Sequence, residues 1–415
     1  MKKVLIICDL FPPAFGPRMG YLAKYLKSYG WTPVIVTEKV NEETFRFMEK
    51  SFDVTYVDYY ENTRFIKIKW FFIVLASILF GYKNRKIYKA AIALTKQHKF
   101  DIILSSTYRS FPSQAAVNVA RETGLPLVVD IRDIVEQFPG DEFIAHSLPR
   151  IPLITPFIVS IFRRISIWER NDVLKKADEV TTVSVWHVDM LKKYNPNVSL
   201  IYNGFDPELF YPVKTKTEKF IITHTGRLLS LAMRDPELFF KAITRLSKEN
   251  ILSPDTCRIQ WYVDSHSESL IRGESKKHSL DDYMDYMGYV SGSEIPNILN
   301  NSSVLLLLAN KNGEDGPRGI MGTKTFEYLA TEKPILCVRS DEDCLEALVK
   351  ETNTGIAART EDEVYNFLKY HHKQWQENGY TQNEAIYEKV NAYSRKEQAS
   401  QFVAIFENIL SKNNG

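Results

Sequence analysis

Two apolar runs joined by a glycine-rich segment constrain the fold of this chain more than any other stretch. Residues 304–308 read VLLLL and residues 335–338 read ILCV. Unbroken apolar runs of this length are typical of strands in a parallel sheet that is covered on both faces. Between them, residues 313–334 read GEDGPRGIMGTKTFEYLATEKP, which predicts a glycine-rich loop and then a helix from about 323 to 330. Strand, loop, helix and strand in this order predict a βαβ unit, and therefore an α/β fold.

The loop and helix of this unit also carry a candidate ligand site. A glycine-rich loop before a helix presents unpaired backbone N–H groups, which suit a phosphate or diphosphate. Lys324 and Glu327 lie three residues apart, so they share one face of the predicted helix. A basic group for phosphates and a carboxylate for a diol are what a nucleotide-sugar site requires. The alternative is an exposed ion pair beside glycines that only permit tight turns.

The same succession of strands, loops and helices recurs along both halves of the chain. Because 415 residues exceed what one hydrophobic core usually supports, we predict two domains. The asparagine–glycine turn near 203–206, followed by a polar irregular stretch, places the boundary there. We predict an N-terminal domain at 1–206, a C-terminal domain at 207–393, and a helix at 394–415 that could cross back to the N-terminal domain.

Charged residues follow several of the predicted strands. Asp130 and Asp133 follow a strand at 127–129, and Arg227 and Arg234 follow a strand at 220–223. Open α/β sheets bind ligands at the carboxyl ends of their strands, and arginine can hold a diphosphate with two parallel hydrogen bonds. The alternatives are a salt-bridged structural cluster for the aspartates and solvated side chains for the arginines. Gly16, in a loop that lacks the G-x-G-x-x-G fingerprint, could approach a ligand or only form a turn.

Net charge and cysteine spacing argue against some classes of function, and two apolar segments leave contact with a membrane open. A formal net charge of +2 gives no argument for nucleic acid, and four cysteines without metal-ligand spacing favour buried thiols in a reducing compartment. Residues 70–81 and 151–164 are apolar stretches with basic neighbours. The first is too short to span a bilayer, so it predicts either a buried helix or peripheral contact with the inner face of a membrane.

Seven segments in this order resemble the GT-B glycosyltransferases, specifically the retaining family 4 (group 1) enzymes. The segments are FPPAFGPR, VVDIRD, ADEVTTVS, IYNGFD, HTGRL with the RDP that follows it, YMGYV and GTKTFEYLATEKPIL. The resemblance covers nearly the whole chain. It implies two Rossmann-like parallel-sheet domains that face a central cleft, the first binding the acceptor and the second binding the nucleotide-diphosphate sugar.

The resemblance also implies roles for individual residues. Arg227 and Arg234 match the basic pair that holds the donor diphosphate, and Glu327 matches the glutamate that accepts the ribose hydroxyls. Gly319 stands where many members have an additional glutamate near the sugar, and no residue clearly matches the N-terminal catalytic histidine. The nearest catalytic candidates are Asp130 and Asp133. The donor-binding candidates are Gly16, Gly226, Arg227, Arg234, Tyr289, Val290, Gly322, Thr323, Lys324 and Glu327.

We therefore expect a cytoplasmic, membrane-associated glycosyltransferase that works without a metal or other cofactor and binds no nucleic acid. Its donor would be a nucleotide-diphosphate sugar, and its acceptor a saccharide or lipid-linked acceptor in surface polysaccharide or glycolipid synthesis. Two alternatives stay open from the sequence. One is a nucleotide-sugar epimerase of the same fold, and the other is a non-catalytic nucleotide-sugar-binding protein, which the glycine at 319 makes plausible.

Overall fold

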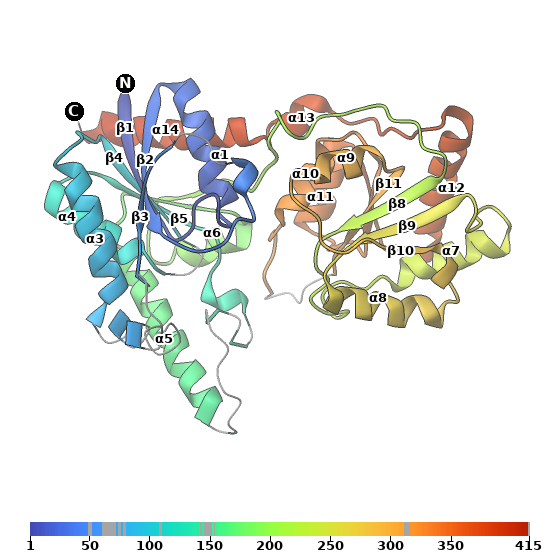
Figure 1. Ribbon diagram of the computed structural model, residues 1–415, viewed down its shortest axis with the longest axis horizontal. Coiled ribbons are helices and arrows are strands. Elements are labelled where there is room, and N and C mark those ends of the chain that lie inside the picture. The colour runs from blue at the N-terminus through green and yellow to red at the C-terminus, as the bar shows by residue number, and fades with distance from the viewer. Residues whose placement is uncertain are drawn as a thin grey trace. The chain divides into compact units, whose positions relative to one another are not determined.

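The computed structural model consists of two compact units, each built on one parallel sheet (Figure 1). It describes residues 1–48, 52–59, 72–73, 76–77, 80–107, 110–138, 140–141, 143–144, 152, 154–310 and 316–413. Unit 1 comprises Met1–Tyr202 together with Gln398–Gly415, and unit 2 comprises Asn203–Glu397. The predicted α/β class with parallel sheets is confirmed.

Unit 1 holds a seven-stranded sheet in the order β3-β2-β1-β4-β5-β6-β7. All its strand pairs are parallel. Strands β1, β4 and β5 are buried along most of their length, as their apolar sequences predict. The strands are β1 (Lys2–Cys8), β2 (Trp31–Glu38), β3 (Asp53–Val57), β4 (Ile102–Thr107), β5 (Leu127–Ile131), β6 (Glu179–Thr182) and β7 (Val198–Leu200).

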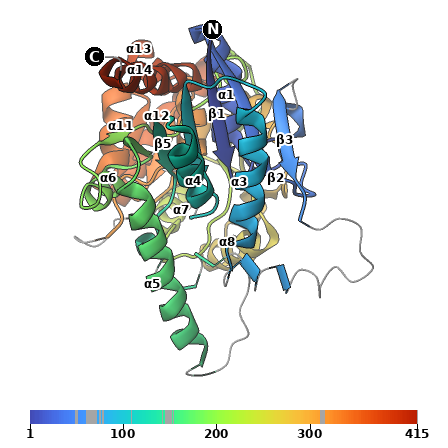
Figure 2. The ribbon, with the colours of Figure 1, turned by 90° about the vertical axis from the view of Figure 1, so that its left-hand side faces the viewer.

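Helices cover both faces of this sheet, and each face has its own apolar core. One core joins the sheet to α1 and α14, and the other joins it to α3, α4 and the C-terminal end of α5. Figure 2 shows α3, α4 and α5 together on one face. The helices of unit 1 are α1 (Pro17–Leu26), α3 (Tyr82–Thr95), α4 (Ser113–Thr123), α5 (Ile154–Leu174), α6 (Val185–Leu191) and most of α14 (Arg395–Asn413), with 3-10 turns at Lys27–Tyr29, Arg46–Met48 and Val135–Gln137.

Unit 2 repeats this design with a six-stranded parallel sheet in the order β10-β9-β8-β11-β12-β13. Its main core lies between the sheet and the helices α7 and α12. The strands are β8 (Phe220–Thr225), β9 (Cys257–Tyr262), β10 (Met284–Tyr286), β11 (Val304–Leu308), β12 (Ile335–Val338) and β13 (Gly355–Ala358). The helices are α7 (Glu237–Lys248), α8 (Ser265–Lys277), α9 (Ile295–Asn300), α10 (Thr323–Leu329), α11 (Cys344–Thr352), α12 (Glu361–Asn378) and α13 (Tyr387–Asn391), with a 3-10 turn at Asp281–Tyr283.

From the sequence alone we expect a polar insertion at 264–282, a strand at 286–290 and a helix that begins at 167, and the structure differs in all three places. The stretch predicted as a polar insertion contains α8, which Asp264 caps by accepting a hydrogen bond from the Ser267 backbone N–H at 2.8 Å, while Ile271 is buried. The strand expected at 286–290 ends at Tyr286, because Gly288 has a φ of +71° that an extended strand does not allow. Helix α5 begins at Ile154, well before the predicted start at 167.

The apolar segment 70–81 lies only partly within the described residues. Ile73 packs into the core of unit 1, whereas Phe72 and Phe80 are 61% and 64% exposed. The segment's other large apolar side chains, including Phe71 and Leu75, lie outside the described residues. Within the described part of the chain, no helix is both long enough and apolar enough to cross a membrane.

Replacing Phe406 with alanine should destabilise unit 1. Phe406 is fully buried on α14, and its ring lies 5.2 Å from that of Trp31 on β2. The cavity left by the truncation should lower the free energy of unfolding by about 3–5 kcal/mol, measured by urea denaturation. Asn408→Ala, an exposed change on the same helix, is the control. An unchanged denaturation midpoint for Phe406→Ala would show that α14 does not stabilise unit 1.

Candidate functional site

The centre of the unit 2 sheet is the place where its topology opens a crevice. Strands β8 and β11 are hydrogen-bonded neighbours, but β8 leads through α7 to β9 on one side, whereas β11 leads through α10 to β12 on the other. The loops that leave the carboxyl ends of β8 and β11 therefore diverge, and open α/β sheets bind ligands at such a point. Most of the donor-binding residues predicted from the sequence lie in these two loops and in α10.

Two side chains of helix α10 form hydrogen bonds with a single residue at the end of β8, Thr225. The Lys324 ammonium donates a hydrogen bond to the Thr225 carbonyl oxygen at 2.9 Å. One helical turn later, the Tyr328 hydroxyl accepts a hydrogen bond from the Thr225 backbone N–H at 2.9 Å and lies 3.0 Å from the Thr225 hydroxyl. Positions four apart lie on the same side of a helix, so Lys324 and Tyr328 together fix the loop after β8 against α10.

Gly226 allows this close contact. A Cβ atom at this position would lie 2.6 Å from the Lys324 ammonium nitrogen, and the φ of +101° disfavours any residue with a side chain. The imidazole of His224 supports the same loop, since its two ring nitrogens lie 2.9 Å from the Leu306 carbonyl oxygen and 3.2 Å from the Gly226 carbonyl oxygen. Glycine at 226 is therefore a requirement of the packing.

The charges around Lys324 are poorly balanced. Burial and, to a smaller extent, the neighbouring Arg234 lower the pKa of Lys324 to about 7, against the opposing effect of Glu327. Burial also lowers the pKa of Arg234, which pairs with no carboxylate among the described residues. For Glu327, burial raises the pKa to about 7, while Arg395 and Lys324 act in the opposite direction. Two cations held close together in a partly buried place favour the binding of an anion.

A second set of contacts holds the loop that carries Arg234. Asn310, at the carboxyl end of β11, accepts a hydrogen bond from the Asp235 backbone N–H at 3.3 Å and donates to the carbonyl oxygens of Leu231 and Ala232. Arg339, just after β12, pairs with the Asp235 carboxylate at 2.9 Å. The sequence interpretation missed both Asn310 and Arg339, although a polar residue directly after a buried strand was the available signal.

The other donor-binding candidates of unit 2 are more exposed. Arg227 pairs with Asp264 at 3.2 Å, and its side chain is 72% exposed. The ring of Tyr289 is 76% exposed, and Val290 is half-buried. Gly322 precedes the first residue of α10, Thr323, and its backbone is extended. These residues lie in the loops that follow β8, β10 and β11.

Comparisons with known proteins agree with this geometry. Residues 18–209 match the sequence model described as Glycosyltransferase Family 4. Over these residues the chain is similar to the family 4 glycosyltransferases, and its two parallel-sheet units have the GT-B fold. No curated protein matches the sequence significantly.

Solved structures share the fold of this chain at low sequence identity. Sucrose-phosphate synthase from Thermosynechococcus elongatus is 14% identical, with a TM-score of 0.62 over 99% of this chain and 100% of that one. Anabaena Alr3699/HepE, in complex with UDP, is 12% identical, with a TM-score of 0.61 over 98% and 100% of the two chains. WaaG, a glycosyltransferase involved in lipopolysaccharide biosynthesis, is 11% identical, with a TM-score of 0.55 over 96% and 99%.

In unit 1, Asp130 is a fully buried ion-pair partner. Its carboxylate accepts hydrogen bonds from the Arg18 guanidinium at 2.9 and 3.0 Å, from the Ser106 hydroxyl at 2.9 Å and from the Thr181 hydroxyl at 2.8 Å. Although burial acts to raise its pKa, the Arg18 charge holds the pKa of Asp130 below its usual value. Arg18 also donates to the carbonyl oxygens of Ile201 and Tyr202, so the pair ties α1, β5 and the end of β7 together.

Asp133 lies nearer the surface and belongs to a different network. Its carboxylate accepts a hydrogen bond from the Gln137 amide, whose oxygen lies 2.8 Å from the Nε2 atom of His187. His187 is fully buried on α6, and burial lowers its pKa to about 4. The sequence interpretation did not single out His187 or Gln137. Gly16, the other unit 1 candidate, packs so closely that a Cβ atom would lie 2.6 Å from the Leu10 carbonyl oxygen.

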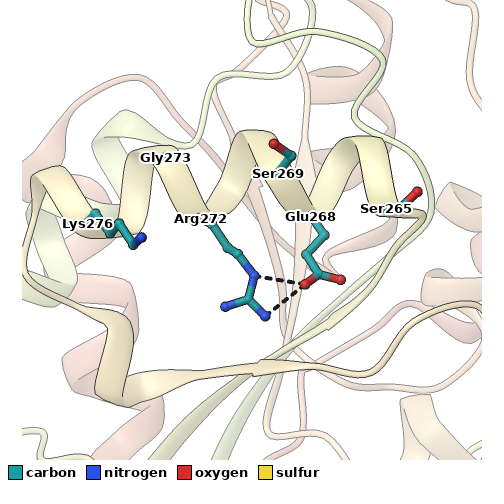
Figure 3. A pocket seen from close by; sticks show the side chains of 6 residues that line it. All are labelled: Ser265, Glu268, Ser269, Arg272, Gly273 and Lys276. Atoms are coloured by element: carbon teal, nitrogen blue, oxygen red, sulfur yellow. Dashed lines mark hydrogen bonds and ion pairs between the residues drawn. The ribbon is translucent and has the colours of Figure 1, made fainter.

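A surface hollow of about 470 Å³ lies along α8 (Figure 3). Arg272 crosses it, pairs with Glu268 at 2.8 Å and stacks 3.8 Å above the Tyr286 ring. Its lining contains none of the predicted site residues and consists of Ser265, Glu268, Ser269, Arg272, Gly273 and Lys276. Over the described residues, no group of three or more histidine, cysteine, aspartate and glutamate side chains is placed to hold a metal ion.

Replacing Asp130 with asparagine should destabilise the protein, because it leaves the buried Arg18 charge without its partner. The expected loss is about 3–5 kcal/mol of unfolding free energy, measured by urea denaturation. Asp172→Asn breaks the exposed Asp172–Lys176 pair and should cost at most about 0.5 kcal/mol. If Asp130→Asn instead kept full stability and lost transferase activity, the carboxylate would act in catalysis and not in the structure.

Proposed function

We propose that the protein transfers a glycosyl group from a nucleotide-diphosphate sugar bound by unit 2 to a saccharide or lipid-linked acceptor bound by unit 1. The transfer would retain the anomeric configuration and serve surface polysaccharide or glycolipid synthesis. Structural neighbours that act on lipopolysaccharide, WaaG and the outer core galactosyltransferase WaaB, support this class of acceptor. The proposal includes a cytoplasmic location, with peripheral contact to the inner face of the membrane through residues 70–81 and 151–164.

The observation that carries the donor site is the pair of cations at the carboxyl end of β8. Burial and, to a smaller extent, the charge of Arg234 lower the pKa of Lys324, and no carboxylate of the described residues pairs with Arg234. A bound diphosphate would place negative charge between them and relieve this repulsion. Charge-assisted contacts of this kind are about twice as strong as those between neutral groups.

The chemistry that follows from this placement is electrostatic. When the bond between the sugar and the diphosphate breaks, negative charge develops on the departing phosphate oxygen. Lys324 and Arg234, assisted by Arg227 and the backbone N–H groups of Gly322 and Thr323, would stabilise that charge, because pre-oriented cations need not reorganise during the reaction. The hydrogen bond from Lys324 to the Thr225 carbonyl oxygen holds the Lys324 ammonium in place before the donor binds.

The remaining roles concern recognition of the donor and the acceptor. Glu327, next to Lys324 on α10, would accept the ribose hydroxyls, and Tyr289 and Val290 would contact the base. From unit 1, Gly16 would approach the donor. Because Asp130 is saturated with hydrogen bonds, Asp133 is the aspartate that we propose for the reaction, with Asp130 positioning the edge of the sheet that carries it.

Loss of Arg234 or of Glu327 should weaken donor binding. UDP-glucose is a suitable probe, because a structure of Alr3699/HepE holds it. We expect the dissociation constant to rise about tenfold to a hundredfold in both Arg234→Ala and Glu327→Ala, measured by calorimetry. Arg245→Ala, at the opposite end of α7, is the control for removing an arginine. Unchanged affinity in both site variants would exclude this donor site.

Donor binding should depend on pH with a maximum near 7. Lys324 has a pKa of about 7 in the empty site, and the diphosphate favours its protonated form, so affinity should fall as the pH rises through 7. Glu327 also has a pKa of about 7, and ribose hydroxyls favour its ionised form, so affinity should fall on acidification. Calorimetry across this range should show Lys324→Met without the alkaline decrease and Glu327→Gln without the acidic one. Identical profiles in all three proteins would contradict these assignments.

A further inference from the structure

Helix α5 presents a stripe of large apolar side chains to solvent. Phe157, Ile161, Ile165 and Trp168 are 66%, 41%, 43% and 69% exposed. Their spacing of four, four and three residues places them along one side of the helix. Every side chain from residue 155 to residue 169 is at least partly exposed, and burial begins only at Arg170. A helix that packs on its own domain normally covers such a stripe, so this one marks a docking surface.

The sequence around the stripe is basic and lacks acidic residues. Residues 143–168 contain Arg150, Arg163 and Arg164 but no aspartate or glutamate. Arg164 is exposed between the apolar positions of the stripe, whereas Arg163 donates hydrogen bonds to backbone carbonyl oxygens in 135–140. Two acidic residues of α5 follow the stripe: Glu169, exposed directly after Trp168, and Asp172, which pairs with Lys176.

The neighbouring helix adds positive charge at the same edge of the sheet. Helix α3 contains Lys83, Arg85, Lys86 and Lys89 and no acidic residue. Helices that connect parallel strands run antiparallel to them, so the N-terminal ends of α3 and α5 both lie toward the carboxyl ends of the strands. Figures 1 and 2 show α5 projecting past the neighbouring helices at that end. The exposed Phe80 lies just before α3 and adds to the apolar surface.

We propose that the stripe Phe157–Ile161–Ile165–Trp168 docks the protein on an anionic lipid bilayer. The four apolar side chains enter the boundary between headgroups and acyl chains. Arg164 and, on α3, Arg85, Lys86 and Lys89 contact lipid phosphates, whereas Lys83 pairs with Glu38. Tryptophan with interspersed basic residues suits this boundary. The combination of apolar stripe and positive charge favours an anionic lipid surface over a second copy of this chain, whose matching surface is equally basic.

This surface goes beyond the segments that the sequence indicated. The stripe continues past residue 164 to Trp168, and its four residues lie on successive turns of helix α5. Because ligands of α/β sheets bind at the carboxyl edge, docking there would bring the acceptor site of unit 1 to the lipid surface. That last consequence rests on the proposed transferase function, whereas the docking itself does not.

The test is sedimentation of the full-length protein with two kinds of vesicle. One kind contains only phosphatidylcholine, and the other contains equal parts of phosphatidylcholine and phosphatidylglycerol. We expect binding to the anionic vesicles, weakened about tenfold or more in the double variant Phe157→Ser/Trp168→Ser. Both side chains are exposed, so the variant should fold, as circular dichroism can verify. Tyr370→Ser, which removes a 62% exposed ring from α12, is the control and should bind like the wild type.

A conservative variant adds a readout of the position of the helix. Of the tryptophans that the structure describes, Trp168 alone is more than one-third exposed. Wild-type fluorescence should therefore shift to the blue on vesicle binding, and Trp168→Phe should still bind but with a smaller shift. Arg234→Ala should bind vesicles normally even though its affinity for UDP-glucose is lowered, so the docking surface and the donor site fail independently.

Three results would overturn the docking proposal. The first is no sedimentation of the wild type with anionic vesicles. The second is equal binding of the wild type and the double variant. The third is a concentration-dependent dimer of the wild type, lost in the double variant, without vesicle binding, which would make a second copy of the chain the occupant of the stripe.

Discussion

The contact of α10 with the end of β8 is the interaction on which the proposed donor site of unit 2 depends. Lys324 and Tyr328 hold the carbonyl oxygen and the N–H of the same residue, Thr225. This fixes the loop after β8 relative to the loop after β11, the two loops that diverge at the centre of the sheet. The space for the Lys324 ammonium exists only because residue 226 is glycine. One helix therefore both supplies the charge and orders the loop beside it.

The two units use buried charge in opposite ways. In unit 1, Arg18 and Asp130 neutralise each other, and the remaining capacity of both groups is taken up by hydroxyl and carbonyl groups. That arrangement is complete without a ligand, so it stabilises the sheet. In unit 2, burial and the charge of Arg234 both disfavour the protonated form of Lys324, and Glu327 opposes them. That arrangement becomes favourable when an anion binds.

The sequence was sufficient for the regular parts of the fold. Strands such as Val304–Leu308 are apolar on both faces, and this pattern does not depend on tertiary contacts. It was insufficient where long-range contacts decide the structure. Helix α8 is polar apart from a few positions, and the N-terminal half of α5 is held by few contacts, so neither has a clear apolar periodicity facing a core.

The candidate site, like the fold, could be predicted from the sequence only in part. Lys324 and Glu327 could be recognised from their spacing on one helix, together with the glycine-rich loop before it. The partner of Lys324 is a backbone oxygen about a hundred residues away in sequence, and Asn310 and Arg339 act through backbone groups and a carboxylate on another loop. Nor could the sequence show that Asp130 forms an ion pair with Arg18, because these two residues are also far apart in the sequence. Such pairings follow only from the topology.

Hydrogen exchange of the full chain with and without UDP-glucose tests the central claim most directly. The account places the donor diphosphate between the loop after β8 and the start of α10. It therefore predicts slower exchange of backbone amides in 225–234 and 321–328 when the ligand is bound, with smaller changes in α7 and α12. Binding accompanied by protection confined to other segments, with these two unchanged, would contradict it.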